Sequence, residues 1–321
     1  MIRVQTGSRL HFGLLCPAPE EGINLQRQYG GVGLMVEAPS IRLFVQPASA
    51  WSAQGPHSER ALEFAKRFSE NFSGPTIAPH LISVEEQAPL EHSGFGVGTQ
   101  LGLAVGKALA LSANIADLSV LDMARFVGRG RRSSLGIHGF EKGGFLVEGG
   151  KQTSASISPL VAQVAFPTEW RLVLVLPTHC QAMHGKAERQ AFMHLKRDSL
   201  HVDALCRLVL LGLLPALAEK DLQTFGAALH EYNARAGEAF ATVQGGRYAH
   251  AKIAEAVHFA RNHGVQGVGQ SSWGPAVFAV VGDDEQAEFL AKGYRRHFDL
   301  VEADVMVTKA RNRGAEALHQ P

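Results

Sequence analysis

The pattern of apolar positions divides the chain into predicted strands and helices. Residues 2–15 are rich in β-branched and aromatic side chains, which is typical of a strand. In residues 59–70, Leu62, Ala65 and Phe68 recur on one face, which indicates an amphipathic helix. The same patterns predict further strands at 34–37, 41–46, 79–86, 170–176, 276–281 and 301–309, and further helices at 99–111, 118–127, 186–196, 199–218, 221–234, 247–262 and 284–297.

The order of these elements indicates the fold class. Strands and helices do not alternate regularly, so we expect an α+β fold rather than a doubly wound parallel sheet. Pro39 is expected to separate the strands at 34–37 and 41–46. A chain of 321 residues is long enough for about two domains. We place the boundary near Pro167, between a first lobe at 1–166 and a second lobe at 167–321.

Composition narrows the possible partners. Hydrophobic residues make up 45% of the chain and charged residues 19%, which is typical of a folded protein. The formal net charge is only +1, so we expect neither nucleic acid nor a membrane as partner, and any anion site must be local. Cys16, Cys180 and Cys206 form no CxxC pair, which favours reduced thiols in a cytoplasmic protein. The start of the chain does not resemble a signal peptide, and the apolar run 208–218 is short for a membrane span and contains Pro215.

Glycine-rich loops are predicted at three places, in 30–33, 94–98 and 267–275, and the stretch 128–150 is also rich in glycine. In Gly94-Phe95-Gly96-Val97-Gly98-Thr99 the glycines permit a tight turn, and the helix predicted to follow adds unpaired N–H groups and a positive dipole end. Such a loop binds phosphate, although a tightly packed structural turn is the alternative. The Lys-Ser/Thr ending of a P-loop is missing.

The order of these loops resembles the superfamily of galactokinase, homoserine kinase, mevalonate kinase and phosphomevalonate kinase (GHMP). Residues 94–99 stand where that superfamily has its phosphate loop, and Gly267-Val268-Gly269-Gln270-Ser271 resembles its third motif. The resemblance implies two lobes, the first like ribosomal protein S5 and the second like ferredoxin. The kinases of this superfamily usually have a catalytic Asp in this region. In this chain the matching position is His138, within Leu135-Gly136-Ile137-His138-Gly139. Phosphate binding is therefore expected without the carboxylate that serves phosphoryl transfer.

At the positions where this sequence departs from the kinases, it resembles another family of the same superfamily. Six motifs in order resemble the β-ribofuranosylaminobenzene 5′-phosphate synthases, namely residues 8–15, 30–34, 92–100, 128–137, 143–150 and 184–192. The resemblance implies condensation of phosphoribosyl pyrophosphate with 4-aminobenzoate or 4-hydroxybenzoate, with release of CO₂ and pyrophosphate, in tetrahydromethanopterin biosynthesis and one-carbon metabolism. Cys16-Pro17 departs from archaeal members, which often have an acidic residue there, and Glu20 or Glu21 is the candidate replacement.

These motifs supply the candidate site residues. We assign Arg27, His92 and His138 to catalysis, with the Arg27 guanidinium as a bidentate partner for carboxylate or pyrophosphate. The residues assigned to phosphate or substrate binding are Arg9, His11, Gly94, Gly96, Val97, Gly98, Thr99, Gln100, Arg131, Glu188, Gly269 and Ser271. Arg129 and Arg132 are further candidates for anion binding, and Lys186 joins Glu188 as a candidate in the second lobe.

Structural roles remain open for several of these residues. Arg131 and Arg132 are equally compatible with a solvated helix end, His11 with a core histidine, and Lys186 and Glu188 with an exposed helical turn. Mg²⁺ is expected with the pyrophosphate substrate, its ligands are not identified, and a homodimer is expected. An ATP-dependent small-molecule kinase and a ligand-binding relative without turnover are the alternative functions.

Overall fold

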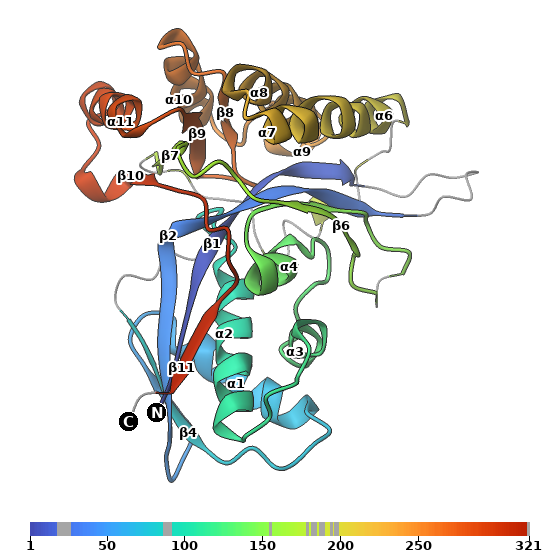
Figure 1. The fold of residues 1–321 in the computed structure, drawn as a ribbon, viewed down its shortest axis with the longest axis vertical. Helices are drawn as coiled ribbons and strands as arrows, with labels where there is room; N and C mark the ends of the chain where they lie inside the picture. The colour runs from blue at the N-terminus through green and yellow to red at the C-terminus, as the bar shows by residue number, and fades with distance from the viewer. Residues whose placement is uncertain are drawn as a thin grey trace.

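Two sheets with helices packed on them form the molecule, and all their strand pairs are antiparallel except β3 (Ser52–Gln54) with β4 (His80–Val84) (Figure 1). The computed structural model describes residues 1–17, 27–85, 92–153, 156–177, 180, 185, 190–192, 195 and 199–319. The expected α+β class is confirmed. In Figure 1 the first sheet and its helices occupy the lower part of the view, and the second sheet lies above with a further set of helices.

The first sheet has seven strands, with β1 and β2 at its centre. The order is β11-β1-β2-β4-β3, and β5 joins β2 to β6. Its strands are β1 (Ile2–Cys16), β2 (Tyr29–Pro47), β3 (Ser52–Gln54), β4 (His80–Val84), β5 (Phe145–Glu148), β6 (Leu160–Val164) and β11 (Glu316–His319). The last strand, β11, thus returns to the first sheet, where it pairs with the beginning of β1.

Helix α2 (Val97–Ser112) is the central helix of the lower part. Twelve of its 16 residues are buried, because it lies between the sheet and the neighbouring helices. These neighbours are α1 (Ser58–Asn71), α3 (Val120–Phe126) and α4 (Leu135–Lys142). A helix buried on nearly all sides explains why residues 101–111 are almost entirely apolar.

The second sheet has the order β10-β7-β9-β8, with every pair antiparallel. Its strands are β7 (Arg171–Val175), β8 (Gly267–Gln270), β9 (Val277–Val281) and β10 (Val305–Thr308). The helices of this part are α6 (Ser199–Leu208), a π-helical turn (Val209–Leu213), α7 (Leu214–Glu219), α8 (Leu222–Glu238), α9 (Ala241–Gln244), α10 (Ala251–Asn262) and α11 (Asp284–Phe298), followed by a 3₁₀ turn (Glu302–Asp304).

Long periodic elements agree with the sequence predictions, and the differences have local causes. The strand at 2–15 and the helices at 59–70 and 284–297 are confirmed. The break at Pro39 was wrong: β2 is continuous, and Pro39 lies in a bulge between the pairs Thr6–Ile41 and Ser8–Val36, where β1 needs no N–H from it. The α2 helix begins at Val97, two residues before the expected start.

Residues 267–270 form a strand rather than the predicted loop. Their glycines serve packing, because a Cβ on Gly267 would lie 3.0 Å from the Cα of Gly226 in α8, and one on Gly269 would meet the side chain of Asn233. Short elements were missed, namely α4, α9, β3, β5, β6 and β11. The helix predicted at 186–196 lies largely outside the described residues.

One helical stretch bears on the expectation of no membrane span. By length and composition, the helical stretch His201–Glu219 could cross a membrane. It extends beyond the apolar run 208–218 noted in the sequence. About 28% of its most apolar window is buried. A single such helix is weak evidence for a membrane span, because core helices of soluble proteins pass the same test.

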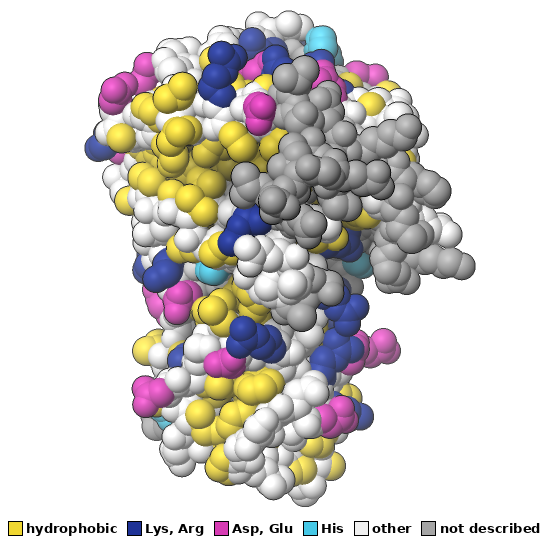
Figure 2. All heavy atoms as spheres, turned by 90° about the vertical axis from the view of Figure 1, so that its right-hand side faces the viewer, with side chains coloured by type: hydrophobic (Ala, Val, Ile, Leu, Met, Phe, Trp, Pro, Cys, Tyr) yellow, Lys and Arg dark blue, Asp and Glu magenta, His cyan; other side chains and the backbone are white. Residues whose placement is uncertain are grey.

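One face of each sheet contributes to a shared hydrophobic cluster, and the other face of the second sheet packs with α10 and α11 in a second cluster. Phe12 on β1 lies 4.7 Å from Phe278 on β9, measured between ring centroids, and buried residues of both sheets form a continuous cluster. On the face drawn in Figure 2, Lys and Arg side chains gather across the waist of the molecule, between one hydrophobic area above and another below.

The outer edge of β1 joins the two parts. β11 pairs with β1 only from Ile2 to Gln5. Beyond it, the His11 N–H donates to Ser271 Oγ at 3.0 Å, and the His11 carbonyl accepts the Ser272 N–H at 2.9 Å. The Asn233 amide nitrogen donates to the carbonyls of Phe12 at 2.6 Å and Gln270 at 2.8 Å, and the Asn233 oxygen accepts the Gln270 N–H at 2.9 Å.

Asn233→Ala should therefore destabilise the whole protein. It leaves buried backbone groups of β1 and β8 without partners, and we expect the free energy of unfolding to fall by about 2–4 kcal/mol in urea titrations. The exposed Asn262 at the end of α10 is the control, and Asn262→Ala should change it by less than about 0.5 kcal/mol. Equal effects of the two substitutions would contradict the proposed role of the joint.

Candidate active site

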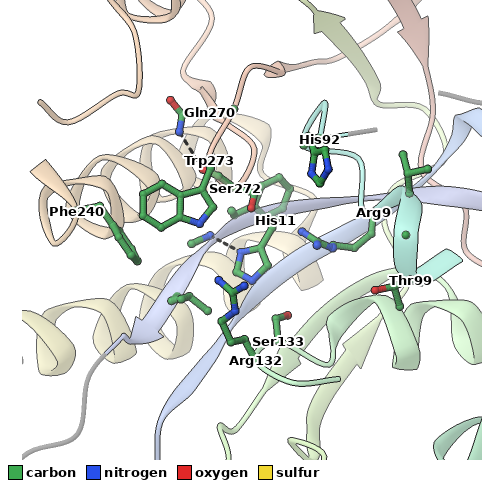
Figure 3. A pocket seen from close by; sticks show the side chains of 18 of the residues that line it. Arg9, His11, His92, Thr99, Arg132, Ser133, Phe240, Gln270, Ser272 and Trp273 are labelled. Atoms are coloured by element: carbon green, nitrogen blue, oxygen red, sulfur yellow. Dashed lines mark hydrogen bonds between the residues drawn. The ribbon is translucent and has the colours of Figure 1, made fainter. Parts of the chain in front are cut away.

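A cavity of about 560 Å³ lies against this joint, between the glycine loop of the first lobe and helices of the second. Figure 3 shows its two unlike ends: Phe240 and Trp273 lie at one side and Thr99 at the other, with His11 and Arg9 between them. The polar end is rich in backbone groups and arginines, and the other end is rich in aromatic rings, with Gln244 and Arg247 also in the lining.

Strand β1 places Arg9 and His11 in the cavity, because residues two apart on a strand face the same side. Arg9 Nε and Nη1 are shielded from solvent and have no hydrogen-bond partner in the described structure. Burial lowers the pKa of Arg9 to about 10, although the nearby Glu148 carboxylate opposes this shift. A buried guanidinium at a cavity wall whose N–H groups have no partner in the protein is suited to bind an anion.

Four further arginines extend this positive wall. Arg60 and Arg67 lie seven residues apart on α1 and so face the same side, while Arg129 and Arg131 come from the loop after α3. Burial, followed by the charges of Arg60, Arg131, Arg9 and Arg67, lowers the pKa of Arg129 to about 10. Among the described residues that line the cavity there is no Asp or Glu. Arg67 pairs with Glu63, outside the lining, at 2.6 Å. A described lining with several guanidinium groups and no carboxylate favours a polyanionic ligand.

The amino end of α2 points its backbone donors into the same region. Gly96 caps the helix in the left-handed conformation (φ 70°), and the N–H groups of Val97 and Gly98 have no acceptor within the helix by geometry. A Cβ on Gly98 would lie 2.4 Å from Arg60 Nη2 and 3.1 Å from Arg129 Nη2. Gly98 therefore lets two guanidinium groups lie against the helix end.

The arginine loop at 128–133 is fixed from below. Lys151 Nζ donates to the carbonyls of Gly130 and Arg131, each at 2.8 Å, and Arg129 donates to Thr99 Oγ1 at 3.2 Å. Lys151 is buried and lies outside the cavity lining. Lys151 is therefore a positioning residue for Arg129 and Arg131, because it holds the backbone of the loop that carries them.

His11 is held neutral with a defined tautomer. Its Nδ1 accepts the Gly13 N–H at 3.2 Å, so in the neutral ring Nε2 carries the proton. Burial and the charge of Arg9 lower the pKa of His11 well below its usual value. The side chain thus offers an uncharged N–H donor in the middle of the cavity, next to the turn that contains Ser272 and Trp273.

Three aromatic rings form a corner at the other end of the cavity, which we call the aromatic corner. Phe192, Phe240 and Trp273 meet edge to face, with ring centroids 4.7–5.7 Å apart. The Arg132 guanidinium lies 4.6 Å from the centroid of the Phe192 ring. The corner is suited to a planar ring, with a cation at its border.

The structure brings together most of the residues that the sequence predicted for phosphate and substrate binding. Those that line the cavity are Arg9, His11, His92, Gly94, Gly96, Val97, Gly98, Thr99, Arg129, Arg131 and Arg132. Glu188, Lys186, Glu20 and Glu21 lie outside the described residues.

Five predicted site residues lie outside the described cavity lining and have structural partners. The Gln100 amide bonds Thr6 and the Gly136 carbonyl, and His138 Nε2 is 2.7 Å from the Ser158 carbonyl oxygen. Ser271 Oγ donates to the Gly94 carbonyl, so it holds the glycine loop on β1, and Gly269 makes room for α8.

Arg27, the fifth of them, donates to the Gly150 carbonyl at 2.9 Å. The catalytic roles assigned to Arg27, His92 and His138 stay predictions, because hydrogen bonds and lining alone do not assign a role in chemistry. Of the three, only His92 lines the described cavity.

The sequence reasoning missed several lining residues. Arg60 and Arg67 were recognisable as a pair on one helix face, although exposed arginines seven apart are common. Phe192, Phe240 and Trp273 come from segments that are far apart in sequence, so no local pattern pointed to the aromatic corner.

The described lining does not fit a protein-held Mg²⁺. In the described part of the chain, no group of three or more His, Cys, Asp or Glu side chains could hold a metal ion. The cavity offers hydroxyl and amide oxygens from these residues but no carboxylate, whereas Mg²⁺ sites in proteins usually contain one or two. Charge on a bound pyrophosphate would be met here by arginines.

Gly98→Ala tests the phosphate end. The added Cβ should displace Arg60 and Arg129 from the helix end, because their flexible side chains move more easily than backbone. We expect inorganic pyrophosphate, measured by titration calorimetry, to bind roughly 10- to 100-fold more weakly. Gly106→Ala in the same helix, outside the cavity, should bind normally. Normal binding by a destabilised Gly98→Ala variant would make the loop purely structural.

His11 should also give the protein a pH-dependent stability. Its folded pKa is lowered, so as pH falls below about 6.5 the unfolded chain takes up a proton that the folded protein does not. Stability should therefore fall with pH, by about 1 kcal/mol more in the native chain than in His11→Gln between pH 7.5 and 5.5. The exposed His258→Gln is the control. Identical pH profiles for native chain and His11→Gln would contradict this prediction.

Solved structures that resemble this chain establish the fold alone. Homoserine kinase from Cytophaga hutchinsonii superposes with a TM-score of 0.70 at 16% identity, over 99% of this chain and 97% of the kinase. Mevalonate diphosphate decarboxylase from Staphylococcus aureus superposes with a TM-score of 0.66 at 12% identity, over 99% of both chains. Residues 213–300 match the model of the GHMP kinase C-terminal domain.

Curated relatives extend over nearly the whole chain. β-Ribofuranosylphenol 5′-phosphate synthase from Archaeoglobus fulgidus is 30% identical over an alignment of 334 positions, gaps included, which covers 98% of this chain and 99% of that protein. The synthase of the same name from Methanothermobacter thermautotrophicus is 28% identical and covers 97% of each chain. The expected family resemblance is thereby confirmed, and the chain belongs to the family of β-ribofuranosylphenol 5′-phosphate synthases, within the GHMP kinase superfamily.

Proposed function

We propose that this synthase condenses phosphoribosyl pyrophosphate with 4-hydroxybenzoate or 4-aminobenzoate, and releases CO₂ and pyrophosphate. One observation carries the proposal: a single cavity combines an arginine-rich end, without a described acid, and an aromatic corner. The first end suits the phosphates of one substrate, and the second suits the ring of the other. The names of the curated relatives favour a phenol product.

The chemistry is an aromatic substitution at the carbon that bears the carboxylate. That carbon attacks C1 of the ribose, and the bond from C1 to the pyrophosphate oxygen breaks with its electron pair leaving on pyrophosphate. The bond to the carboxylate then breaks, and its electron pair restores the aromatic ring as CO₂ departs. No proton is removed from carbon, so the reaction requires no general base there.

The residues of the cavity fit these needs. Arg9, Arg60 and Arg129, with the amino end of α2, would neutralise the leaving pyrophosphate in a site that is pre-organised for anions. We propose that any Mg²⁺ arrives on the phosphate oxygens of the substrate. The 5-phosphate would occupy another part of the same wall.

The benzoate carboxylate must lie beside the ribose, at the border of the aromatic corner. Arg132 and His11 both reach that border, Arg132 through its contact with Phe192 and His11 through the Ser272 turn. A neutral His11 N–H would orient the carboxylate while stabilising its charge less than a second cation would, which favours loss of CO₂. We propose tetrahydromethanopterin biosynthesis as the context and a homodimer as the assembly.

The decisive experiment uses carboxyl-labelled substrate. The protein is incubated with phosphoribosyl pyrophosphate, Mg²⁺ and labelled 4-hydroxybenzoate or 4-aminobenzoate. We expect labelled CO₂ and pyrophosphate in equal amounts, and a product whose mass is that of the C-riboside phosphate. Release of ADP from ATP that depends on an alcohol substrate, with no labelled CO₂, would identify a kinase instead. Tight binding without turnover would identify a ligand-binding relative.

A further inference from the structure

Gln244, the last residue of α9, lines the cavity and has a side-chain acceptor that no described donor uses. Gln244 lies four residues after Phe240, and its backbone N–H donates to the Phe240 carbonyl, so both side chains share one helix face. The Gln244 amide nitrogen donates to the carbonyls of Gly237 at 3.3 Å and Arg247 at 2.9 Å. These bonds use both of its N–H groups and fix the amide, and no described donor reaches Oε1.

The other amides in this part of the cavity are engaged within the protein. Gln270 Oε1 accepts the Ala249 N–H at 2.8 Å, and Gln270 Nε2 donates to the Ser272 carbonyl at 2.9 Å. Asn233 uses its amide in the joint with β1. The hydroxyl of Ser272 belongs to the middle of the cavity, beside His11, in Figure 3. Gln244 therefore offers the amide acceptor that the aromatic end has available.

The reaction fixes which end of the ring faces this acceptor. The reacting carbon bears the carboxylate, so the carboxylate lies toward the ribose and the arginines. The substituent in the para position is then at the opposite end of the ring, deepest in the aromatic corner. A hydroxyl and an amino group both carry a hydrogen that an amide oxygen accepts.

We propose that Gln244 is the specificity-determining residue for the para substituent, and that its Oε1 accepts a hydrogen bond from that group. The inference rests on the proposed function. A single neutral acceptor does not distinguish O–H from N–H, so the enzyme accepts both 4-hydroxybenzoate and 4-aminobenzoate. It rejects 4-methoxybenzoate, whose substituent still donates electrons to the ring but has no O–H or N–H donor and leaves the amide oxygen unpaired.

The test compares three benzoates in three proteins. In the native chain we expect kcat/KM for 4-methoxybenzoate to be roughly 10- to 100-fold below that for 4-hydroxybenzoate. Gln244→Leu keeps the bulk and removes the acceptor, and Gln244→Ala also opens space. Both should lower kcat/KM for the hydroxyl and amino substrates by roughly 10-fold or more, and Gln244→Ala should leave or improve that for 4-methoxybenzoate.

Further measurements separate this reading from a structural one. KM for phosphoribosyl pyrophosphate should stay within about twofold in both variants, because Phe240, next to α9, lies at the side of the cavity opposite Thr99. The exposed Gln223→Ala, outside this cavity, is the matched control. Equal losses for all three benzoates, or no loss for 4-hydroxybenzoate, would overturn the assignment of Gln244. Absence of turnover by the native chain with either natural benzoate would instead overturn the proposed function.

Discussion

The arrangement of the two lobes depends on how the backbone N–H and C=O groups at the outer edge of β1 find hydrogen-bond partners. After Gln5, no strand of the described residues pairs with β1 on that side, and its backbone groups bond instead to the glycine loop and to the second lobe. The Arg9 N–H donates to the Phe95 carbonyl, and the Tyr232 hydroxyl donates to the Gly13 carbonyl at 2.9 Å. Buried backbone groups must be paired, so the edge of β1 fixes the positions of the glycine loop, the α8 helix and the β8–β9 turn. These elements surround the side chains of Arg9 and His11 in the cavity.

The close approach of α8 to β1 needs a glycine in the strand. A Cβ on Gly13 would lie 2.3 Å from Cβ of Ala236, and Gly13 has φ 153° at a register shift with β2. The same bulge turns the Gly13 N–H toward His11 Nδ1. One irregularity thus seats the second lobe, fixes the tautomer of His11 and shapes the centre of the cavity.

What the sequence revealed reflects the range of the interactions involved. The glycine loop is local, since its turn and its helix adjoin in the chain, so residues 94–99 were found together. Gln100, one residue further, was included although its side chain turns inward to Thr6. The aromatic corner unites Phe192, Phe240 and Trp273 from three distant segments, so only the folded chain reveals it. Gly267 and Gly269 suggested a loop, because the helix that requires their small size is not adjacent in sequence.

The reaction proposed for this synthase would share a phosphate-bearing substrate with the kinases of the same fold and would differ from them in the nucleophile. A kinase needs a carboxylate to orient a hydroxyl, and here the corresponding position is His138, whose ring nitrogen faces the Ser158 carbonyl. An aromatic carbon that exchanges carboxylate for ribose needs no such group. It needs a surface that holds a flat ring against the sugar, and in the proposed reaction this would be the aromatic corner, at the end of the cavity opposite the glycine loop.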